Sequence, residues 1–442
     1  MKTPSQIVSP FDFSTFKPND SIVIGSHDLS VEIDKKATIV TAEISLKFTP
    51  FPMLWAKFPL EALGIDPLML MVHTVNSQIR ITAVNNPESE CVVSDWDSEH
   101  VLAHFLLHAL SGPKNSSLTY VTFHVLNFPK YHGTPVSKDA GWHAGRLALD
   151  DGTWRVTMDA DRSTSDLTGA LSKMGGYALT HIGKLERASG RRFSSTNALS
   201  VVERLMFFLC FARSDWAPPL IVTGYDDSDT PVWYDWSLKR STPWTNNQTW
   251  WPSTKPSILQ GVFPTFMSLL DDKKIWGPSL RKMIYWYCHA SSRNSGADGS
   301  LILLQSALEI LAWTYLTRHR KAISEKTYGR MDAADSLRLL LNFCEIDDAI
   351  PSRLPLLVHF ASQPSRLDGP AAFTSIRNWT IHPTASEVNA RLQKTTKSPP
   401  HFQALQLGIE YFERVLLHLC NYRGPYMPPS DDPFRKTTVT IG

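Results

Sequence analysis

The first 160 residues alternate apolar and polar positions with a period of two. The alternation is clearest from Ala37 to Phe48, and it returns over Gln78–Val84 and Leu118–Leu126. Such a pattern predicts strands with one buried face. Farther along, Asp150-Asp151-Gly152 separates two more apolar runs, and its glycine supplies the positive φ that a hairpin turn requires. We therefore expect a β-rich N-terminal domain over residues 1–160, either a sandwich or a partial barrel.

The pattern changes between residues 161 and 265. One amphipathic helix is predicted over Asn197–Ala212, with Ser195 or Thr196 as its N-cap, among segments rich in Trp, Pro, Gly and Asp. We expect a mixed α/β middle region that packs on the N-terminal domain.

From residue 270 to residue 442 the apolar positions recur at steps of three and four, which predicts helices. The predicted helices are Leu280–Ala290, Leu301–Arg320, Ala333–Phe343, Leu354–Ala361 and Phe402–Cys420. The expected fold class is thus a multidomain α+β protein with an all-α bundle at its C-terminus.

The composition of the chain excludes several further classes of protein. The 442 residues carry 44 Lys and Arg against 42 Asp and Glu, and 43% of the chain is hydrophobic, which excludes disorder as a description of the whole chain. The five cysteines lie far apart, mostly in apolar runs, and are expected to be buried, reduced thiols. No signal-peptide core and no apolar run of membrane-spanning length is seen, so we expect a cytoplasmic protein with no membrane partner. Residues 275–442 carry a net charge of +5, which favours a polyanionic partner for this part.

Two motifs resemble a phosphate-binding loop and a metal site, but each lacks residues that its function requires. Residues 176–184 end in Gly-Lys, but Ala178 stands where a phosphate-binding loop needs glycine and Leu185 where it needs Ser or Thr. His100, His104 and His108 recur every four residues, which would align three imidazoles on one face of a helix that starts near Ser98. No downstream Cys or His cluster completes a metal site, so we expect an amphipathic helix and no metal.

The segment Ser375–Pro383 carries the strongest candidate chemistry. It contains Arg377, followed by Asn378 and, after four intervening residues, His382. In a chain with 23 Arg and 15 His, about two such pairs arise by chance, and the second here is Arg353 with His359. Context distinguishes them, since Arg353 precedes an apolar run whereas Arg377 precedes an amide.

The region around Arg377 resembles the HEPN domain, whose signature is Arg, a polar residue and a His after four to six intervening residues. Three further segments are similar to the ApeA-like branch of that family: Met283–Tyr287, Gln305–Trp313 and Asn421–Tyr426. Gly176–Glu186 through Phe207–Arg213 also looks like the part that precedes the HEPN domain in such proteins.

The resemblance implies a metal-independent endoribonuclease that needs no cofactor and acts on RNA, with tRNA one candidate, at a homodimer cleft. His382 is the expected acid/base and Arg377 the phosphate clamp, with Asn378 as an orienting residue, and the product would carry a 2′,3′-cyclic phosphate. Such enzymes are toxins or antiviral defence effectors that arrest their host by abortive infection. A protein trigger or regulator is then expected at the N-terminal domain.

Other interpretations remain open at this stage. The HEPN bundle would, in the main alternative, only dimerise or bind nucleic acid or a nucleotide, with Arg377 and His382 as structural residues. Another places function in a β-rich domain that binds carbohydrate or peptide. Glu309 lies in an apolar helix, where a carboxylate is costly unless it is paired. We expect Glu309 to support the site by pairing with an arginine of the bundle, with Arg377 as the candidate partner.

Overall fold

The computed structural model describes residues 3–11, 15–75, 78–84, 86–106, 112–138, 141–246, 248–292, 296–362, 366–382, 399–430 and 438–441. The chain divides into two compact units. The N-terminal unit comprises Met1–Met206 and Ala217–Thr245, and the C-terminal unit comprises Phe207–Trp216 and Asn246–Gly442. The fold class is mixed α+β, as the sequence predicts.

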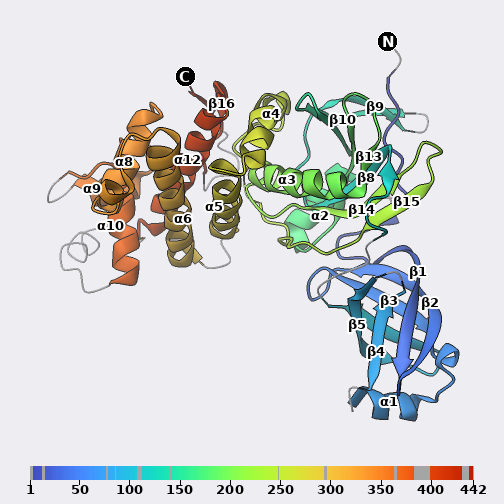
Figure 1. Ribbon diagram of the computed structural model, residues 1–442. Helices are drawn as coiled ribbons and strands as arrows, with labels where there is room; N and C mark the ends of the chain where they lie inside the picture. Colours follow the sequence, from blue (N-terminus) through green and yellow to red (C-terminus); the bar gives the residue numbers. More distant parts are fainter. Residues whose placement is uncertain are drawn as a thin grey trace. The chain divides into compact units, whose positions relative to one another are not determined.

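The N-terminal unit begins with a closed six-stranded barrel of strand order β1-β2-β3-β6-β5-β4 (Figure 1). Its strands are β1 (Ile22–Ile33), β2 (Lys36–Lys47), β3 (Met53–Pro59), β4 (Ile79–Ala83), β5 (Asn86–Trp96) and β6 (His100–Phe105). The short helix η2 (Leu60–Leu63) and helix α1 (Pro67–Val75) connect β3 to β4. The barrel is closed and has no free sheet edge. The sequence predicted either a sandwich or a partial barrel for this region.

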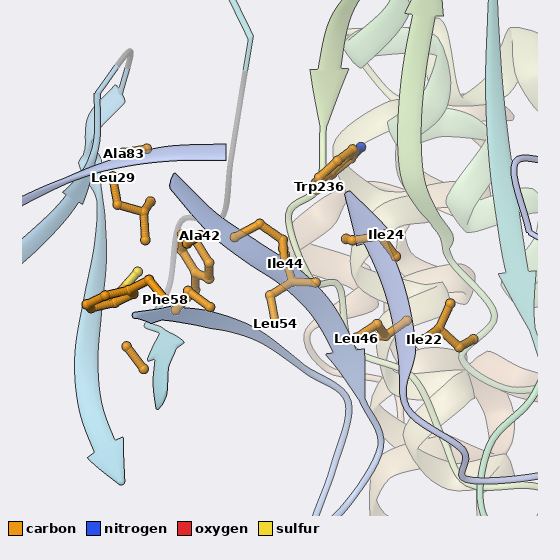
Figure 2. Close-up of a cluster of buried hydrophobic side chains, with 14 of the residues drawn as sticks. Ile22, Ile24, Leu29, Ala42, Ile44, Leu46, Leu54, Phe58, Ala83 and Trp236 are labelled. Atoms are coloured by element: carbon orange, nitrogen blue, oxygen red, sulfur yellow. The ribbon is translucent and has the colours of Figure 1, made fainter. Parts of the chain in front are cut away.

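The barrel core comes from the alternating positions that the sequence shows. On β2, Val40, Ala42, Ile44 and Leu46 are buried, and they meet side chains of β1 and β3 in the interior (Figure 2). The β1–β2 hairpin closes through Asp34 and Lys35, which both have positive φ.

The same unit contains a seven-stranded antiparallel sheet of order β15-β14-β8-β12-β11-β10-β9. Its strands are β8 (Tyr120–Leu126), β9 (Thr134–Lys138), β10 (Gly141–Asp150), β11 (Trp154–Ala160), β12 (Leu179–Arg187), β14 (Pro219–Tyr225) and β15 (Pro231–Asp235). The same part of the chain contains the short paired strands β7 (Ser117–Leu118) and β13 (Phe193–Ser194) and the helices α2 (Thr164–Met174) and α3 (Ser195–Arg213). The predicted hairpin turn at Asp150-Asp151-Gly152 is confirmed, with Gly152 at φ 83°. The sheet draws strands from both sides of residue 160.

The structure shows what the Gly-Lys segment and the histidine repeat of the sequence form. Residues 179–187 form strand β12 in the middle of the sheet, and Gly183 lies directly against the Phe123 ring, so the glycine has a packing role. The helix expected around His100 and His104 is wrong, because these residues lie on strand β6. A spacing of four fits both a helical period and an alternating strand, and on β6 both histidines share the face opposite the buried residues. His108 lies outside the described residues.

The C-terminal unit is helical, as predicted. Its helices are α4 (Ser257–Asp271), α5 (Trp276–Ser291), α6 (Gly296–Trp313), which continues as the π-helix η3 (Thr314–His319), α7 (Glu325–Tyr328), α8 (Ala333–Phe343), α9 (Pro355–Ser362), α10 (Gly369–Ile381) and α12 (His401–Leu419). Strands β16 (Gly424–Tyr426) and β17 (Val439–Ile441) pair near the C-terminus. Helix α6 is central, since it packs against α5, α8, α10 and α12.

The C-terminal end of α3, from Phe207 onwards, belongs to the C-terminal unit. Two buried tryptophans donate hydrogen bonds to its last carbonyl groups. The indole Nε1 of Trp250 donates to the carbonyl of Phe211 at 2.9 Å, and that of Trp251 donates to the carbonyl of Ala212 at 2.7 Å. These bonds supply donors to carbonyl groups at the helix end, and the Phe211 carbonyl also accepts the N–H of Ser214 at 3.2 Å.

All five cysteines are buried and free, which confirms the prediction of buried thiols. Among the described residues, α3 and the run Gly296–His319 are long and apolar enough to cross a membrane by length and composition alone. In each, 61% of the apolar window is buried inside the protein, as in the core helix of a soluble protein.

Candidate functional site

The candidate site lies at the end of α10, a helix whose start is firmly fixed. Asp368 caps it, since its side chain accepts the N–H of Ala371 at 2.9 Å, and Pro370 occupies the first turn. Arg338 of α8 donates to the same carboxylate at 2.6 Å. Burial alone would raise the pKa of Asp368, but the hydrogen bonds from Arg338 and Ala371 together lower it. The cap is therefore ionised and charge-paired.

One face of α10 is buried in the bundle. Phe373 and Ile376 have no exposed surface, and Phe373 packs where α12 carries Gly408. A side chain at Gly408 would come within 2.7 Å of Phe373 and of Leu304 on α6. This close contact fixes the rotation of α10 and so sets which residues of its last turn face outward.

Arg377 is half-buried at the edge of that face. Its Nη1 donates to the side-chain oxygen of Asn378 at 3.0 Å. Its Nε is buried and has no hydrogen-bond partner, and no ion pair to Arg377 is found among the described residues. The guanidinium therefore keeps unused donors, which is the state expected of a group that binds an anion.

His382 follows the last residue of α10. Its backbone N–H donates to the carbonyl of Asn378 at 2.8 Å, and its φ of −125° and ψ of 75° end the helix. The imidazole is exposed. Asn378 thus contacts both other motif residues, Arg377 through its side chain and His382 through its main chain. Pro383 and the residues up to 398 lie outside the described part of the chain.

The expected burial and pairing of Glu309 are wrong. Glu309 is exposed on α6, and its carboxylate accepts a hydrogen bond of 2.8 Å from Gln305, one turn earlier on the same helix. No bond between Glu309 and Arg377 is found in the part of the chain that the structure describes. An exposed carboxylate is solvated by water, so it needs no cationic partner.

The second Arg/His pair has a structural arginine. Arg353 forms an ion pair with Glu410 of α12, whose residue is only 5% exposed, and Arg414 contacts the other oxygen of that carboxylate at 3.5 Å. His359 is exposed on α9. Arg353 is therefore committed to a buried carboxylate, unlike Arg377.

His401 is a further histidine near the end of α10, and no motif in the sequence points to it. It is the first residue of α12, it is 7% exposed, and its ring lies 5.4 Å from that of Trp379 on α10. Neither ring nitrogen has a hydrogen bond, and Nε2 lies 3.9 Å from the carboxylate of Asp298. Burial lowers the pKa of His401, with Asp298 acting in the opposite direction. The preceding Pro400 is the signal that would have extended the predicted helix back to this residue.

Over the described residues, no group of three or more His, Cys, Asp or Glu side chains is arranged to hold a metal ion. The arrangement at the end of α10 offers instead a cation with unused donors and an exposed imidazole five residues apart.

Two segments of the chain match domains of a known family. Residues 113–247, which contain the seven-stranded sheet, match the YopA central domain, and residues 273–436 match the YopA C-terminal domain. The chain is 26% identical over 423 residues to the SPbeta prophage-derived uncharacterized protein YopA of Bacillus subtilis (strain 168). That alignment covers 94% of this chain and 93% of the relative. No solved structure matches.

Proposed function

The chain belongs to the YopA family, with that family's central and C-terminal domains, and we propose that it is a metal-independent endoribonuclease whose C-terminal domain is of the HEPN type. The active residues are Arg377 and His382, and Asn378 orients them. The observation that carries this proposal is that Arg377, which keeps unused donors and bonds the side chain of Asn378, lies in the last turns of α10, and that His382 with its exposed imidazole directly follows this helix.

The chemistry requires no metal. The imidazole of His382 removes the proton of a ribose 2′-hydroxyl, and the 2′-oxygen attacks the adjacent phosphorus. The bond from phosphorus to the 5′-oxygen breaks, and that oxygen leaves with a proton. Arg377 donates to the phosphate oxygens and stabilises the charge that builds on them. The products are a 2′,3′-cyclic phosphate and a 5′-hydroxyl.

A second copy of the chain completes the site. One protomer supplies one Arg377 and one His382, whereas the reaction needs both a base and an acid. In a homodimer, the partner's imidazole protonates the leaving oxygen. The enzyme then acts as a toxin or defence effector whose cleavage of cellular RNA arrests the host.

Expression in a bacterial host tests this proposal in the cell. The wild type and His359→Ala should arrest growth, while His382→Ala and Arg377→Ala at equal protein levels should not. His359→Ala is the matched control because it removes the histidine of the other Arg/His pair. Equal toxicity of the wild type and His382→Ala would contradict the proposal.

A further inference from the structure

Residues 3–11 form a strap that runs along the seven-stranded sheet before the chain enters the barrel (Figure 1). The strap first extends the sheet at its outer strand, β9, where Ser5 pairs in parallel with Ser137. Gln6 donates its N–H to the carbonyl of Ser137 at 2.9 Å, and Ser137 donates to the carbonyl of Pro4 at 2.9 Å. The free edge of β9 is thus occupied by main-chain hydrogen bonds.

Beyond the edge, the main chain of the strap is bound by an ion pair of the sheet in which the carboxylate is buried and the guanidinium is partly exposed. Ile7 donates its N–H to Asp159 at 2.8 Å, and Arg146 donates to the carbonyl of Ser5 at 2.8 Å. Asp159 is fully buried and is paired with Arg146 at 2.7 Å. The sheet therefore presents both an acceptor and a donor that recognise an extended backbone.

The strap's side chains add two further polar contacts. Gln6 donates its amide to Asp161 at 3.2 Å, and Ser9 hydrogen-bonds His124 at 3.1 Å. The ring of Phe11 lies 5.0 Å from the ring of His124. Asp161 and His124 are both almost fully buried. The recognition surface is therefore built into the sheet and does not belong to the strap.

The strap fills this surface only in part. None of its nine residues is buried, and the side chain of Val8 is 86% exposed. Two cavities, of about 690 Å³ and about 1010 Å³, are both lined by strap residues Ser5, Ile7, Val8 and Pro10. The first also contains Tyr120, Thr157, Lys184 and Tyr225, and the second also contains Lys138, Asp161, Arg162 and Ser163. We call the surface of the sheet that the strap contacts, together with these two cavities, the strap groove.

We propose that the strap groove binds an extended, uncharged segment of a partner polypeptide, and that the strap occupies the groove until that segment replaces it. Recognition through main-chain groups at a strand edge suits any extended peptide. The lining of each cavity carries two basic and two acidic side chains, so neither cavity has a net charge and an uncharged occupant fits best. Beneath the strap, Arg146 is paired with Asp159 and Lys138 with Asp161. The strap itself, Thr-Pro-Ser-Gln-Ile-Val-Ser-Pro-Phe, has no charged side chain.

This inference uses residues of the N-terminal unit alone and is independent of the ribonuclease proposal. Ile7 and Phe11 of the strap are partly buried and pack against the hydrophobic core, whereas Val8 is exposed. Displacement of the strap therefore gives up the contacts of these two side chains, which an incoming apolar segment can replace. A partner chain that reaches into both cavities would bury more surface than the strap does.

The experiment measures binding of a labelled peptide of residues 3–11 to the full-length protein by fluorescence anisotropy. Ile7→Pro removes the N–H that Asp159 accepts, whereas Val8→Pro changes the neighbouring residue, whose N–H has no bond to the described residues. Ile7→Pro should bind the peptide about tenfold more tightly than the wild type, because its own strap competes less well. Val8→Pro should bind it as the wild type does.

Equal binding by the three proteins, no binding by any of them, or equal binding of a scrambled peptide would overturn the proposal. Circular dichroism verifies that the variants are folded. If Ile7→Pro fails to fold, Gln6→Ala decides instead, because it removes only the amide bond to Asp161 and should shift binding in the same direction.

Discussion

The hydroxyl of Tyr426 donates a hydrogen bond of 2.7 Å to Glu413, a carboxyl buried in the centre of the C-terminal unit. Tyr287 of α5 donates to the other oxygen at 2.5 Å, and Ser214 contributes at 3.4 Å. Burial raises the pKa of Glu413 to about 7, although all three hydroxyls act to lower it. The carboxyl of Glu413 on α12 therefore joins this helix to α5, to Ser214, which follows α3, and to Tyr426 of β16.

Glu413 should make the stability of the C-terminal unit depend on pH. Its pKa is about 7 when folded against 4.5 for an exposed glutamate, so the folded state binds the proton more tightly. The contribution is complete below pH 4.5 and is lost as the pH rises towards 7 and above. The loss is about 3 kcal/mol, since each pKa unit corresponds to about 1.4 kcal/mol.

Urea unfolding between pH 4.5 and 8 measures this effect. Glu413→Gln should remove that part of the pH dependence, whereas Glu309→Gln, a change at an exposed residue of the same unit, should retain it. An unchanged slope in Glu413→Gln would show that another group is responsible.

Arg353→Leu should destabilise the protein without affecting RNA cleavage. The change leaves the buried carboxylate of Glu410 with Arg414 as its remaining cation, and we expect a loss of about 2 kcal/mol. Thermal melting and a cleavage assay on the same preparation test both parts. Loss of cleavage at full stability would assign the second Arg/His pair a catalytic role.

Gly183→Ala should destabilise the seven-stranded sheet. A Cβ at Gly183 would lie 2.1 Å from the Phe123 ring, which is fully buried, so we expect a loss of about 1–3 kcal/mol. Gly169→Ala on α2 is the matched control, because no atom lies within 4 Å of its added Cβ. That change should be neutral or stabilising, as expected for alanine in a helix. Equal melting temperatures for the two variants would refute this account of Gly183.

Glu309 and Arg377 should behave independently. Because Glu309 is exposed and hydrogen-bonded within α6, a double-mutant cycle of Glu309→Ala and Arg377→Ala should give a coupling energy below about 0.5 kcal/mol. A coupling of about 1 kcal/mol or more, measured by unfolding, would restore the direct contact that the sequence suggested.

Local patterns predicted most of the architecture. The alternation over Ala37–Phe48 predicted β2 within one residue at each end, and the helical steps over Ala333–Phe343 predicted α8 to the residue. Prediction failed at His100 and His104, where a spacing of four satisfies both a helix and a strand. The alternation of buried Val101, Ala103 and Phe105 shows that the strand period was the relevant one.

Contacts between distant segments could not be predicted. The bonds of Asn378 to Arg377 and to His382 join residues close together in the sequence, so a sequence motif can encode that arrangement. Glu413 instead depends on Tyr287, 126 residues away. Likewise, nothing in the pattern of residues 3–11 indicates that Ile7 binds Asp159, which lies 152 residues along the chain. Glu309 and Glu413 both occur in apolar helices, and only the packing distinguishes the exposed one from the buried one.

The most direct test of the central claim is cleavage of purified tRNA and total RNA in EDTA, with chemical mapping of the new 3′ ends. We predict 2′,3′-cyclic phosphate ends from the wild type and from His359→Ala, and no cleavage by His382→Ala. No cleavage by the wild type, cleavage that persists in His382→Ala, or new ends that carry a free 3′-hydroxyl would contradict the assignment of Arg377 and His382 as a metal-independent ribonuclease site.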